Sequence, residues 1–300
     1  MRVLVSGASG LIGTHLLTEL RQRGHETFQL VRTTPQNPEH KIGWLPSRKQ
    51  LDANMLSEKK IDAVINLSGK SIAGLWTKKH LHQVRASRID STSLLAETVA
   101  AMNPRPKVFI SASAIGLYGD RGNERLTEES GSGDGFLASL CRDWEGAADP
   151  AREAGIRVVH PRFGVVLSNE GGFLSPLLPL YRFGLGMLLG DGKQIISWVH
   201  LEDAIGALVA LLESGRARGA VNIVSPNPVT MREFHDTLAG VLRRPALFRV
   251  PAAFLRVLVP GGMAEEMMLV SQAVYPEALK KQGYKHRFTE CREALENLLL

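Results

Sequence analysis

The sequence predicts an α/β protein with a doubly wound parallel sheet and a smaller C-terminal lobe. Three observations indicate this fold class. A strand pattern, a glycine-rich turn and a helix pattern open the chain, strand and helix patterns then alternate up to residue 160, and glycine and proline become dense between residues 164 and 192. Alternating strands and helices are typical of parallel sheets that carry helices on both faces.

Each expected element follows from the spacing of its apolar residues. Runs of apolar and β-branched residues predict strands at 2–6, 27–32, 62–67, 107–112, 157–160 and 220–224. Helical spacing predicts helices at 12–23, 77–102, 135–153, 202–212 and 230–242. The last of these begins with a capping box, formed by Thr230 and by Glu233 three residues later. Residues 41–51 fit neither pattern, and we expect a short hairpin there.

The turn after the first strand carries three glycines that are spaced three residues apart. The first permits a sharp turn, the second lets a pyrophosphate approach the backbone, and the third lets the helix pack closely on the sheet. The N-terminus of the following helix offers free N–H groups and a partial positive charge to phosphates. The pattern therefore predicts a Rossmann dinucleotide site. Its residues in this turn are Gly7, Ser9, Gly10, Leu11, Ile12 and Gly13.

The second strand ends at Val31 and Arg32, which we also assign to the nucleotide site. Rossmann proteins selective for NAD place an Asp or Glu at this point, where it bonds the ribose hydroxyls. A guanidinium instead binds a 2′-phosphate through charge-assisted hydrogen bonds of roughly 1.5–3 kcal/mol. The sequence therefore favours NADP(H) as the cofactor. The alternative is that Arg32 is a solvated residue at the end of a strand.

The spacing of the first glycines resembles extended, atypical members of the short-chain dehydrogenase/reductase superfamily, the NAD(P)-dependent epimerases and dehydratases. The resemblance covers nearly the whole chain, with further matching segments at 66–69, 111–113, 117–119, 190–194 and 198–203. Within the superfamily the chain is most similar to the YfcH-type "epimerase family" subgroup. The segments that carry this similarity are 87–89, 141–145, 196–200 and the basic, apolar tail after Arg249.

The resemblance implies cofactor contacts outside the glycine turn. Leu67, Ser68 and Gly69, which follow the third strand, would line the adenine-side ribose and the phosphates. Arg88 on the long helix would face the cofactor, and Val166 would contact the nicotinamide. The alternatives are a surface arginine for Arg88 and a core residue for Val166.

The usual catalytic pair of the superfamily, Tyr-x-x-x-Lys, is absent from this sequence. Tyrosines occur at 118, 181, 275 and 284, and none has a lysine four residues later. The segment expected to carry the pair, residues 135–141, lacks acid–base groups. The resemblance leaves Ser113 to bond a substrate carbonyl and Tyr118 to donate a proton. The alternatives are a strand-end serine and a packing residue, and His200 is expected to cap or bridge a helix.

Two function classes remain. The first is an NADP-dependent oxidoreductase or epimerase-like enzyme that acts on an unknown small molecule. The second is a catalytically weak, NADPH-binding regulatory protein. Nucleotide sugars are expected to be poor substrates, because Gln194 is followed by Ile195 and Ile196 where sugar-nucleotide enzymes typically carry an arginine for the diphosphate.

The expected organisation has three parts. Residues 1–162 form the NADP-binding Rossmann domain, to which 193–225 contribute, and residues 163–248 form mainly the substrate lobe. Residues 249–300 form a family-specific C-terminal segment. We expect this segment to pack on the smaller lobe, with a partner surface as the alternative.

Charge and composition exclude several classes of function. The formal net charge of +6 comes without a long basic run, so no nucleic-acid partner is expected. Cys141 and Cys291 lack metal-ligand spacing, so neither a disulfide framework nor a metal site is expected. The first strand begins at residue 2, which leaves no room for a signal peptide, and no apolar run is long enough for a membrane span. We expect a cytoplasmic protein, and the sequence leaves a homodimer open.

Overall fold

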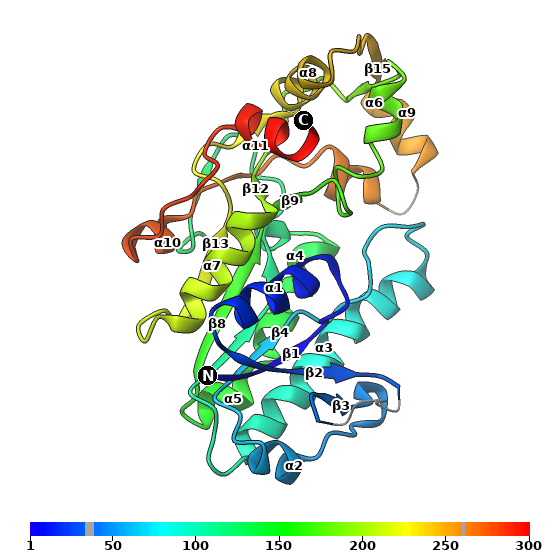
Figure 1. Cartoon of the computed structure of the whole chain (residues 1–300). Helices are drawn as coiled ribbons and strands as arrows, with labels where there is room; N and C mark the ends of the chain where they lie inside the picture. The colour runs from blue at the N-terminus through cyan, green and yellow to red at the C-terminus, as the bar shows by residue number, and fades with distance from the viewer. Residues whose placement is uncertain (34–38, 260–261) are drawn as a thin grey trace.

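A parallel sheet forms the centre of the computed structural model, which describes residues 1–33, 39–259 and 262–300. Its strand order is β13-β8-β5-β4-β1-β2-β3, and β6 pairs with β8 beside this path (Figure 1). The strands of this sheet are β1 (Arg2–Ser6), β2 (Glu26–Val31), β3 (Lys41–Gly43), β4 (Ala63–Asn66), β5 (Val108–Ser111), β6 (Ser113–Ala114), β8 (Arg157–Phe163) and β13 (Gly219–Ile223).

Helices cover both faces of this sheet. Helices α1 and α7 pack on one face, and α2, α3 and α5 pack on the other. Their bounds are α1 (Leu11–Gln22), α2 (Ala53–Glu58), α3 (Lys78–Ala101), α5 (Asp149–Glu153) and α7 (Leu201–Glu213). Along β1, Val3 and Val5 join the first of these cores and Leu4 joins the second. Burial on both faces explains why the strands read as continuous apolar runs.

A smaller lobe begins where the chain leaves the carboxyl end of β8 and enters β9 (Figure 1). Its short strands pair two by two, β9 with β12, β10 with β15 and β11 with β14. The elements of this lobe are β9 (Val165–Leu167), α6 (Leu178–Arg182), β10 (Met187–Leu189), β11 (Ile195–Ile196), β12 (Trp198–His200), β14 (Val229–Thr230), α8 (Met231–Leu242) and β15 (Phe248–Val250). A separate apolar core around Trp198, Phe234 and Leu238 holds them together.

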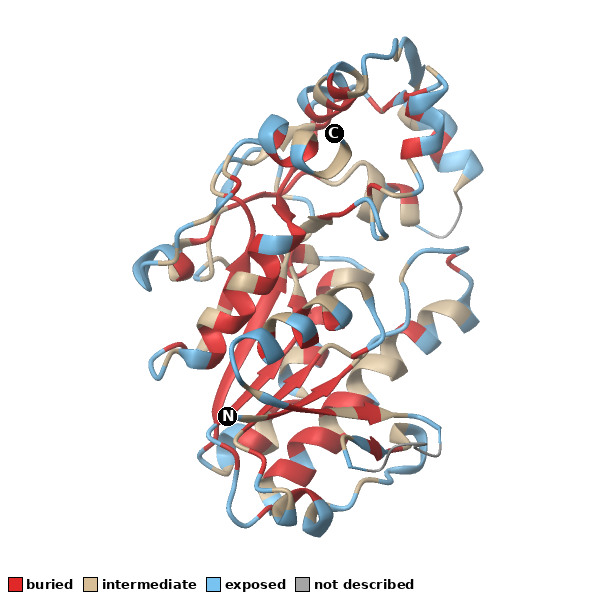
Figure 2. Ribbon diagram, in the orientation of Figure 1, coloured by how far each residue is buried: buried red, intermediate tan, exposed pale blue. Residues whose placement is uncertain are grey.

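The C-terminal tail contacts both parts of the molecule. Helix α11 packs on α8 of the smaller lobe, as expected, whereas α10 packs against β13 and β16 pairs with β7. The segments are β7 (Arg125–Leu126), α9 (Ala252–Leu258), the π-helix η3 (Ala264–Met268), β16 (Ala273–Val274), α10 (Glu277–Lys281) and α11 (Cys291–Leu299). Much of α9 is exposed (Figure 2). Over the described ranges, we find no helix whose length and apolarity would suit a membrane span.

Most expected elements lie within one residue of their observed bounds, and three differ. The helix expected at 135–153 divides into α4 (Phe136–Gly146) and α5, because Pro150 in the first turn of α5 lacks an N–H group. The strand expected at 157–160 continues to Phe163, where β13 pairs with it. The hairpin expected at 41–51 is wrong, because the strand in this segment does not pair with a neighbouring antiparallel strand of the same segment. There β3 pairs in parallel with β2, and only the bridge between Leu45 and Gln50 is antiparallel.

Candidate functional site

The glycine turn between β1 and α1 is too crowded for side chains at two of its three glycines. Gly7 lies at φ +69°, in the left-handed region, and a Cβ there would lie 2.5 Å from the carbonyl oxygen of Leu67. A Cβ at Gly13 would overlap the carbonyl oxygen of Gly7. At Gly10 a Cβ would meet, among the described residues, only that same oxygen, at 3.3 Å. The surface in front of Gly10 is therefore open to a ligand.

The N-terminus of α1 starts at this open surface. Gly10 is the N-cap residue, no side chain caps it, and the first turn of α1 contains no acidic residue. Ser9 is exposed, while Leu11 and Ile12 are partly buried against the core of the sheet. Free N–H groups and the positive end of the helix dipole fit a pyrophosphate here. The residues present thus suit the phosphates of a dinucleotide.

The segment after β4 is held beside this turn by Asn66, a residue to which the sequence had assigned no role. Its Oδ1 accepts hydrogen bonds from Ser6 Oγ at 2.6 Å and from the Ser68 N–H at 3.2 Å, and its Nδ2 donates to Thr92 Oγ1 at 2.8 Å. Asn66 therefore links β1, α3 and the loop that begins at Leu67. An asparagine that ends an otherwise apolar strand was the available signal.

Arg88 of α3 folds back onto the same loop. Its Nη1 donates to the carbonyl oxygens of Lys70 and Val84, both at 3.0 Å, and a Cβ at Gly69 would lie 3.2 Å from its Cζ. The guanidinium carbon lies 5.1 Å from the centre of the Trp144 ring, and burial lowers the pKa of Arg88. The structure thus brings Arg88 against the predicted segment 67–69. Its contact with a cofactor stays a prediction.

Val166 lies on the side of the sheet that carries α1. It pairs with Val199 between β9 and β12, and it is partly buried against the same core as Leu11 and Leu67. Packing against the core that Leu11 and Leu67 also contact agrees with either a nicotinamide contact or a core role. The nicotinamide contact stays a prediction.

Arg32 is exposed at the end of β2, where it lines an open hollow of about 620 Å³. Trp44, Lys49 and Asp52 also line this hollow. Within the described part of the chain, the Arg32 guanidinium has no hydrogen-bond or ion-pair partner. A free cation in an open hollow at the end of β2 fits a phosphate on the ribose of a dinucleotide.

Ser113 and Tyr118 belong to one buried network. Ser113 Oγ donates to Glu145 Oε1 at 2.7 Å, and Arg162 binds both oxygens of Glu145, from Nε at 2.8 Å and from Nη2 at 3.0 Å. Arg162 Nη1 also donates to the Tyr118 hydroxyl at 2.9 Å, which in turn donates to Asn222 Oδ1 at 2.7 Å. No ion pair or hydrogen bond of Glu145, Arg162 or Asn222 was predicted, because their partners lie on distant segments.

The two hydroxyl groups of the network are buried, and the side chain of Glu145 is 16% exposed. Ser113 is 2% exposed and Tyr118 is 0% exposed. Although burial acts against ionisation of Glu145, its hydrogen bonds and charge interaction with Arg162 hold the pKa of this carboxyl below its ordinary value. Burial raises the pKa of Tyr118, and Arg162 offsets only part of this effect. Both hydroxyls already have partners, so their catalytic roles stay a prediction that requires rearrangement of these bonds.

A second carboxylate reaches the helix where the catalytic pair was expected. Glu266, from the C-terminal tail, accepts hydrogen bonds from the N–H groups of Phe136 at 2.9 Å and Leu137 at 2.7 Å, and so caps α4. Gly135 lies at φ +100°, and a Cβ there would lie 2.9 Å from the Glu266 carboxyl carbon. Since 130 residues separate Glu266 from Phe136, sequence reasoning could not find this contact.

His200 has the capping role that the sequence predicted. Its Nδ1 accepts a hydrogen bond from the Glu202 N–H at 3.1 Å at the start of α7, and its ring lies 4.0 Å from the Phe288 ring, centre to centre. Burial lowers the pKa of His200. The described residues contain no group of three or more His, Cys, Asp or Glu side chains arranged to hold a metal ion.

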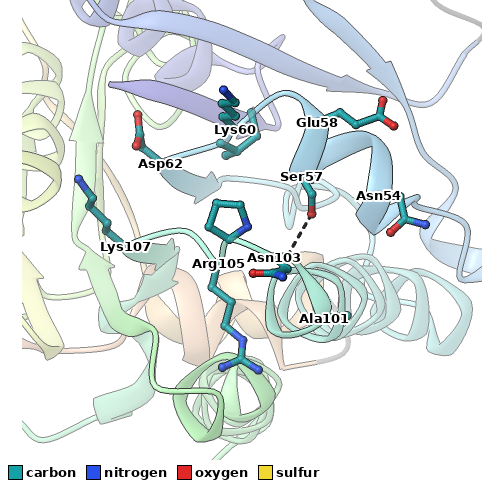
Figure 3. Close-up of a pocket in the computed structure, with 11 residues that line it drawn as sticks. Asn54, Ser57, Glu58, Lys60, Asp62, Ala101, Asn103, Arg105 and Lys107 are labelled. Carbon is teal, nitrogen blue, oxygen red and sulfur yellow. Dashed lines mark hydrogen bonds between the residues drawn. The ribbon is translucent and has the colours of Figure 1, made fainter.

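A hollow of about 760 Å³, larger than the one beside Arg32, lies at the opposite edge of the sheet. Figure 3 shows Lys60, Asp62, Arg105 and Lys107 around it, where the chain enters β4 and β5. Because Rossmann sheets bind ligands at the carboxyl ends of their strands, this amino-end hollow is not the dinucleotide site. The size of a hollow alone would have selected the wrong edge.

Comparison with known proteins gives two family matches on this chain. The family described as "NAD dependent epimerase/dehydratase family" matches residues 3–224, and a domain of unknown function, DUF1731, matches residues 250–298. Epimerase family protein ML0860 of Mycobacterium leprae is 37% identical over 98% of this chain and 94% of its own length.

Two solved structures are similar over the whole of this chain. The crystal structure of human epimerase family protein SDR39U1 (isoform 2) with NADPH has a TM-score of 0.88 and 31% identity, and 99% of each chain is covered. A nucleoside-diphosphate sugar epimerase from Corynebacterium glutamicum has a TM-score of 0.81 and 35% identity, with 100% of this chain and 58% of that chain covered.

Proposed function

We propose that this chain, which belongs to the NAD dependent epimerase/dehydratase family, binds NADPH at the carboxyl edge of its sheet and acts on a small molecule. The observation that carries this proposal is Arg32, an exposed guanidinium with no partner among the described residues. A 2′-phosphate offers this cation a dianionic partner, whereas the ribose hydroxyls of NADH do not. The crystal structure of the human relative with NADPH supports this choice.

The reaction that we propose is an oxidoreductase or epimerase-like conversion with slow turnover. Bound NADPH would supply the hydride chemistry. Ser113 would bond a substrate carbonyl, and for this its hydroxyl hydrogen must turn away from Glu145 Oε1. Because general acid–base assistance is typically worth about 10²–10⁴ in rate, the missing Tyr-x-x-x-Lys pair should make each turnover slow.

The second candidate is a regulatory protein in which NADPH binding sets the position of the smaller lobe. One observation favours it, namely the burial and full pairing of Ser113 and Tyr118. A hydroxyl without access to a ligand contributes to stability and not to proton transfer. The two candidates differ in whether a substrate oxidises bound NADPH.

Calorimetric titration with NADPH and NADH tests the cofactor. We expect NADPH to bind at least about tenfold more tightly, since one charge-assisted phosphate contact contributes roughly 1.5–3 kcal/mol. Arg32→Glu should invert this preference, and equal affinities of the two cofactors for the unmodified protein would overturn the proposal. A panel of aldehydes, ketones and quinones, followed by nicotinamide absorbance, then separates the enzyme from the regulator.

Nucleotide sugars remain, in our proposal, poor substrates. The side chain of Gln194 donates to the carbonyl oxygens of Leu189 and Met268, both at 3.1 Å, and Ile196 is buried. Arg232 and Arg249 lie beside this stretch, and each already donates to a carbonyl oxygen in it, that of Asp191 at 3.4 Å and that of Gly190 at 2.7 Å. A diphosphate placed here would therefore lose hydration and would have to compete for these cations. Micromolar binding of a uridine or guanosine diphosphate sugar in a titration would refute this. The relative named as a nucleoside-diphosphate sugar epimerase makes the titration worthwhile.

We further propose a cytoplasmic protein without a nucleic-acid partner, and a homodimer stays open. Both cysteines, Cys141 and Cys291, are buried and free, and the net charge of +6 is spread along the chain. For the domains we propose a Rossmann domain of residues 1–162, to which 193–225 contribute, and a substrate lobe formed mainly by 163–248. Residues 249–300 form the C-terminal segment. Packing of α7 and pairing of β13 on the central sheet support a contribution of 193–225 to the first domain, while β11 and β12 of this range lie in the smaller lobe.

A further inference from the structure

The hollow beside Arg32 contains a second cation that the proposed function does not use. Lys49 is exposed and lines the same hollow of about 620 Å³. Across the described ranges, its side chain has no hydrogen-bond or ion-pair partner. Among the described residues that line the hollow, Asp52 alone is acidic, and it accepts hydrogen bonds from the N–H groups of Asn54 and Met55 as the N-cap of α2. The hollow therefore presents two free cations and a carboxylate that is already engaged.

The loop that contains Lys49 starts next to the end of β2. The Trp44 N–H donates to the carbonyl oxygen of Val31 at 3.0 Å, so the chain leaves β3 directly beside the residue that precedes Arg32. Two backbone hydrogen bonds between Leu45 and Gln50, at 2.9 and 3.1 Å, then close the loop that contains Lys49. Main-chain hydrogen bonds thus hold the backbone of the loop at Lys49.

The conformation of Lys49 is unusual for a lysine. Its φ of +52° and ψ of +39° lie in the left-handed region, which residues with a Cβ rarely occupy. Glycine would adopt this conformation without strain. Lys60 has a similar backbone conformation, and Lys49 differs from it in that it lines the same open hollow as the free Arg32.

We propose that Lys49 is a second cation for the ribose 2′-phosphate, which Arg32 and Lys49 hold between them. This inference rests on the proposed binding of NADPH. A phosphate dianion has more charge than one guanidinium neutralises, and an ammonium binds phosphate as a point charge from any direction. Since the 2′-phosphate is what distinguishes NADPH from NADH, Lys49 contributes to cofactor selectivity and not to dinucleotide affinity in general.

Calorimetric titration of Lys49→Met with NADPH and NADH tests this role. We expect the NADPH dissociation constant to rise about fivefold at low salt, as for one exposed charge-assisted contact, while that of NADH changes less than about twofold. The NADPH affinity of the variant should also depend less steeply on ionic strength, because one screened ion pair is gone. Lys49→Arg should restore most of the selectivity.

Lys60→Met is the matched control. Lys60 is also an exposed lysine with a left-handed backbone, at φ +49°, but it lines the hollow at the opposite edge of the sheet. Equal effects of the Lys49→Met and Lys60→Met substitutions on NADPH binding would overturn the role of Lys49. If the unmodified protein prefers NADPH and Arg32→Ala removes this preference completely, no part of the preference is left for Lys49. That result would overturn the role of Lys49 and leave the proposed binding of NADPH intact. Failure of the proposed function itself would appear as no preference in the unmodified protein.

Discussion

The glycine turn and the Ser113–Tyr118 network differ in how they treat polar groups. At the turn, the N–H groups at the start of α1 have no side-chain cap, and the space before Gly10 is open. In the network, Ser113 and Tyr118 are buried and each bonds at least one partner. Polar groups without a protein partner at a surface are free to bind water or a ligand, whereas buried polar groups must be paired within the fold. The difference indicates that the turn is a binding site and that the network stabilises the fold.

Removal of the arginine from the network should have the largest effect. Arg162→Met leaves the Glu145 carboxylate buried without its bidentate partner, and we expect the free energy of unfolding to fall by about 3–5 kcal/mol. Urea denaturation followed by circular dichroism measures this loss. The double variant with Glu145→Gln should recover part of it, because no charge is then left unpaired. A loss below about 1 kcal/mol would contradict a structural role for the network.

The turn should respond differently at two of its glycines. Gly13→Ala places a Cβ against the Gly7 carbonyl oxygen, and such overpacking typically costs about 1–3 kcal/mol of stability. Gly10→Ala brings its Cβ to 3.3 Å from the same oxygen, a tight contact that a small shift relieves, so we expect a smaller loss of stability than for Gly13→Ala while the affinity for NADPH falls about tenfold or more through contact with the pyrophosphate. Thermal denaturation and calorimetry separate the two effects. Unchanged NADPH affinity in Gly10→Ala would remove the pyrophosphate from this surface.

Substitution of Ser113 and of Tyr118 tests whether the network, besides stabilising the fold, takes part in catalysis. With an active substrate, Ser113→Ala should lower kcat by about tenfold or more and leave the NADPH affinity within about twofold. Tyr118→Phe removes only the hydroxyl between Arg162 and Asn222. A lower rate at unchanged stability would identify Tyr118 as the proton donor. Lower stability at an unchanged rate would assign it to packing, and equal rates in both variants would remove both residues from catalysis.

The smallest expected effect is the pH dependence of stability. The pKa of Glu145 is lowered in the folded protein, so its contribution is present above the ordinary value of 4.5 and is lost as pH falls through the lowered value. Thermal denaturation from pH 7 to pH 3 should therefore show a steeper acid limb for the unmodified protein than for Glu145→Gln. The charge of Glu145 also raises the pKa of buried His160 against the effect of burial, so the difference between the two curves contains the response of both groups. Parallel curves would mean that Arg162 does not stabilise the ionised carboxyl.

Much of the fold was predictable, because its signals are local. Strands β1, β2, β4 and β5 and helices α1, α3, α7 and α8 follow from apolar periodicity and end within one residue of their expected bounds. The capping box of Thr230 and Glu233 needs only four consecutive residues, and it is present. The edge strand β3 was missed because three residues carry no period. The break before α5 was missed because apolar spacing continued across it.

The sequence by itself determined the glycine turn and the arginine at the end of β2, because each depends on residues close together in the chain. It also determined the family, because each of the matching segments is short and can be recognised on its own. The tertiary structure alone decided what Ser113, Tyr118 and Lys49 face. Between 17 and 130 residues of sequence separate Glu145, Arg162 and Glu266 from the partners that they bind. Burial of the whole core drives the closure of such long loops. No local pattern encodes these pairs, since each side chain has a partner only after the sheet, the lobe and the tail have packed together.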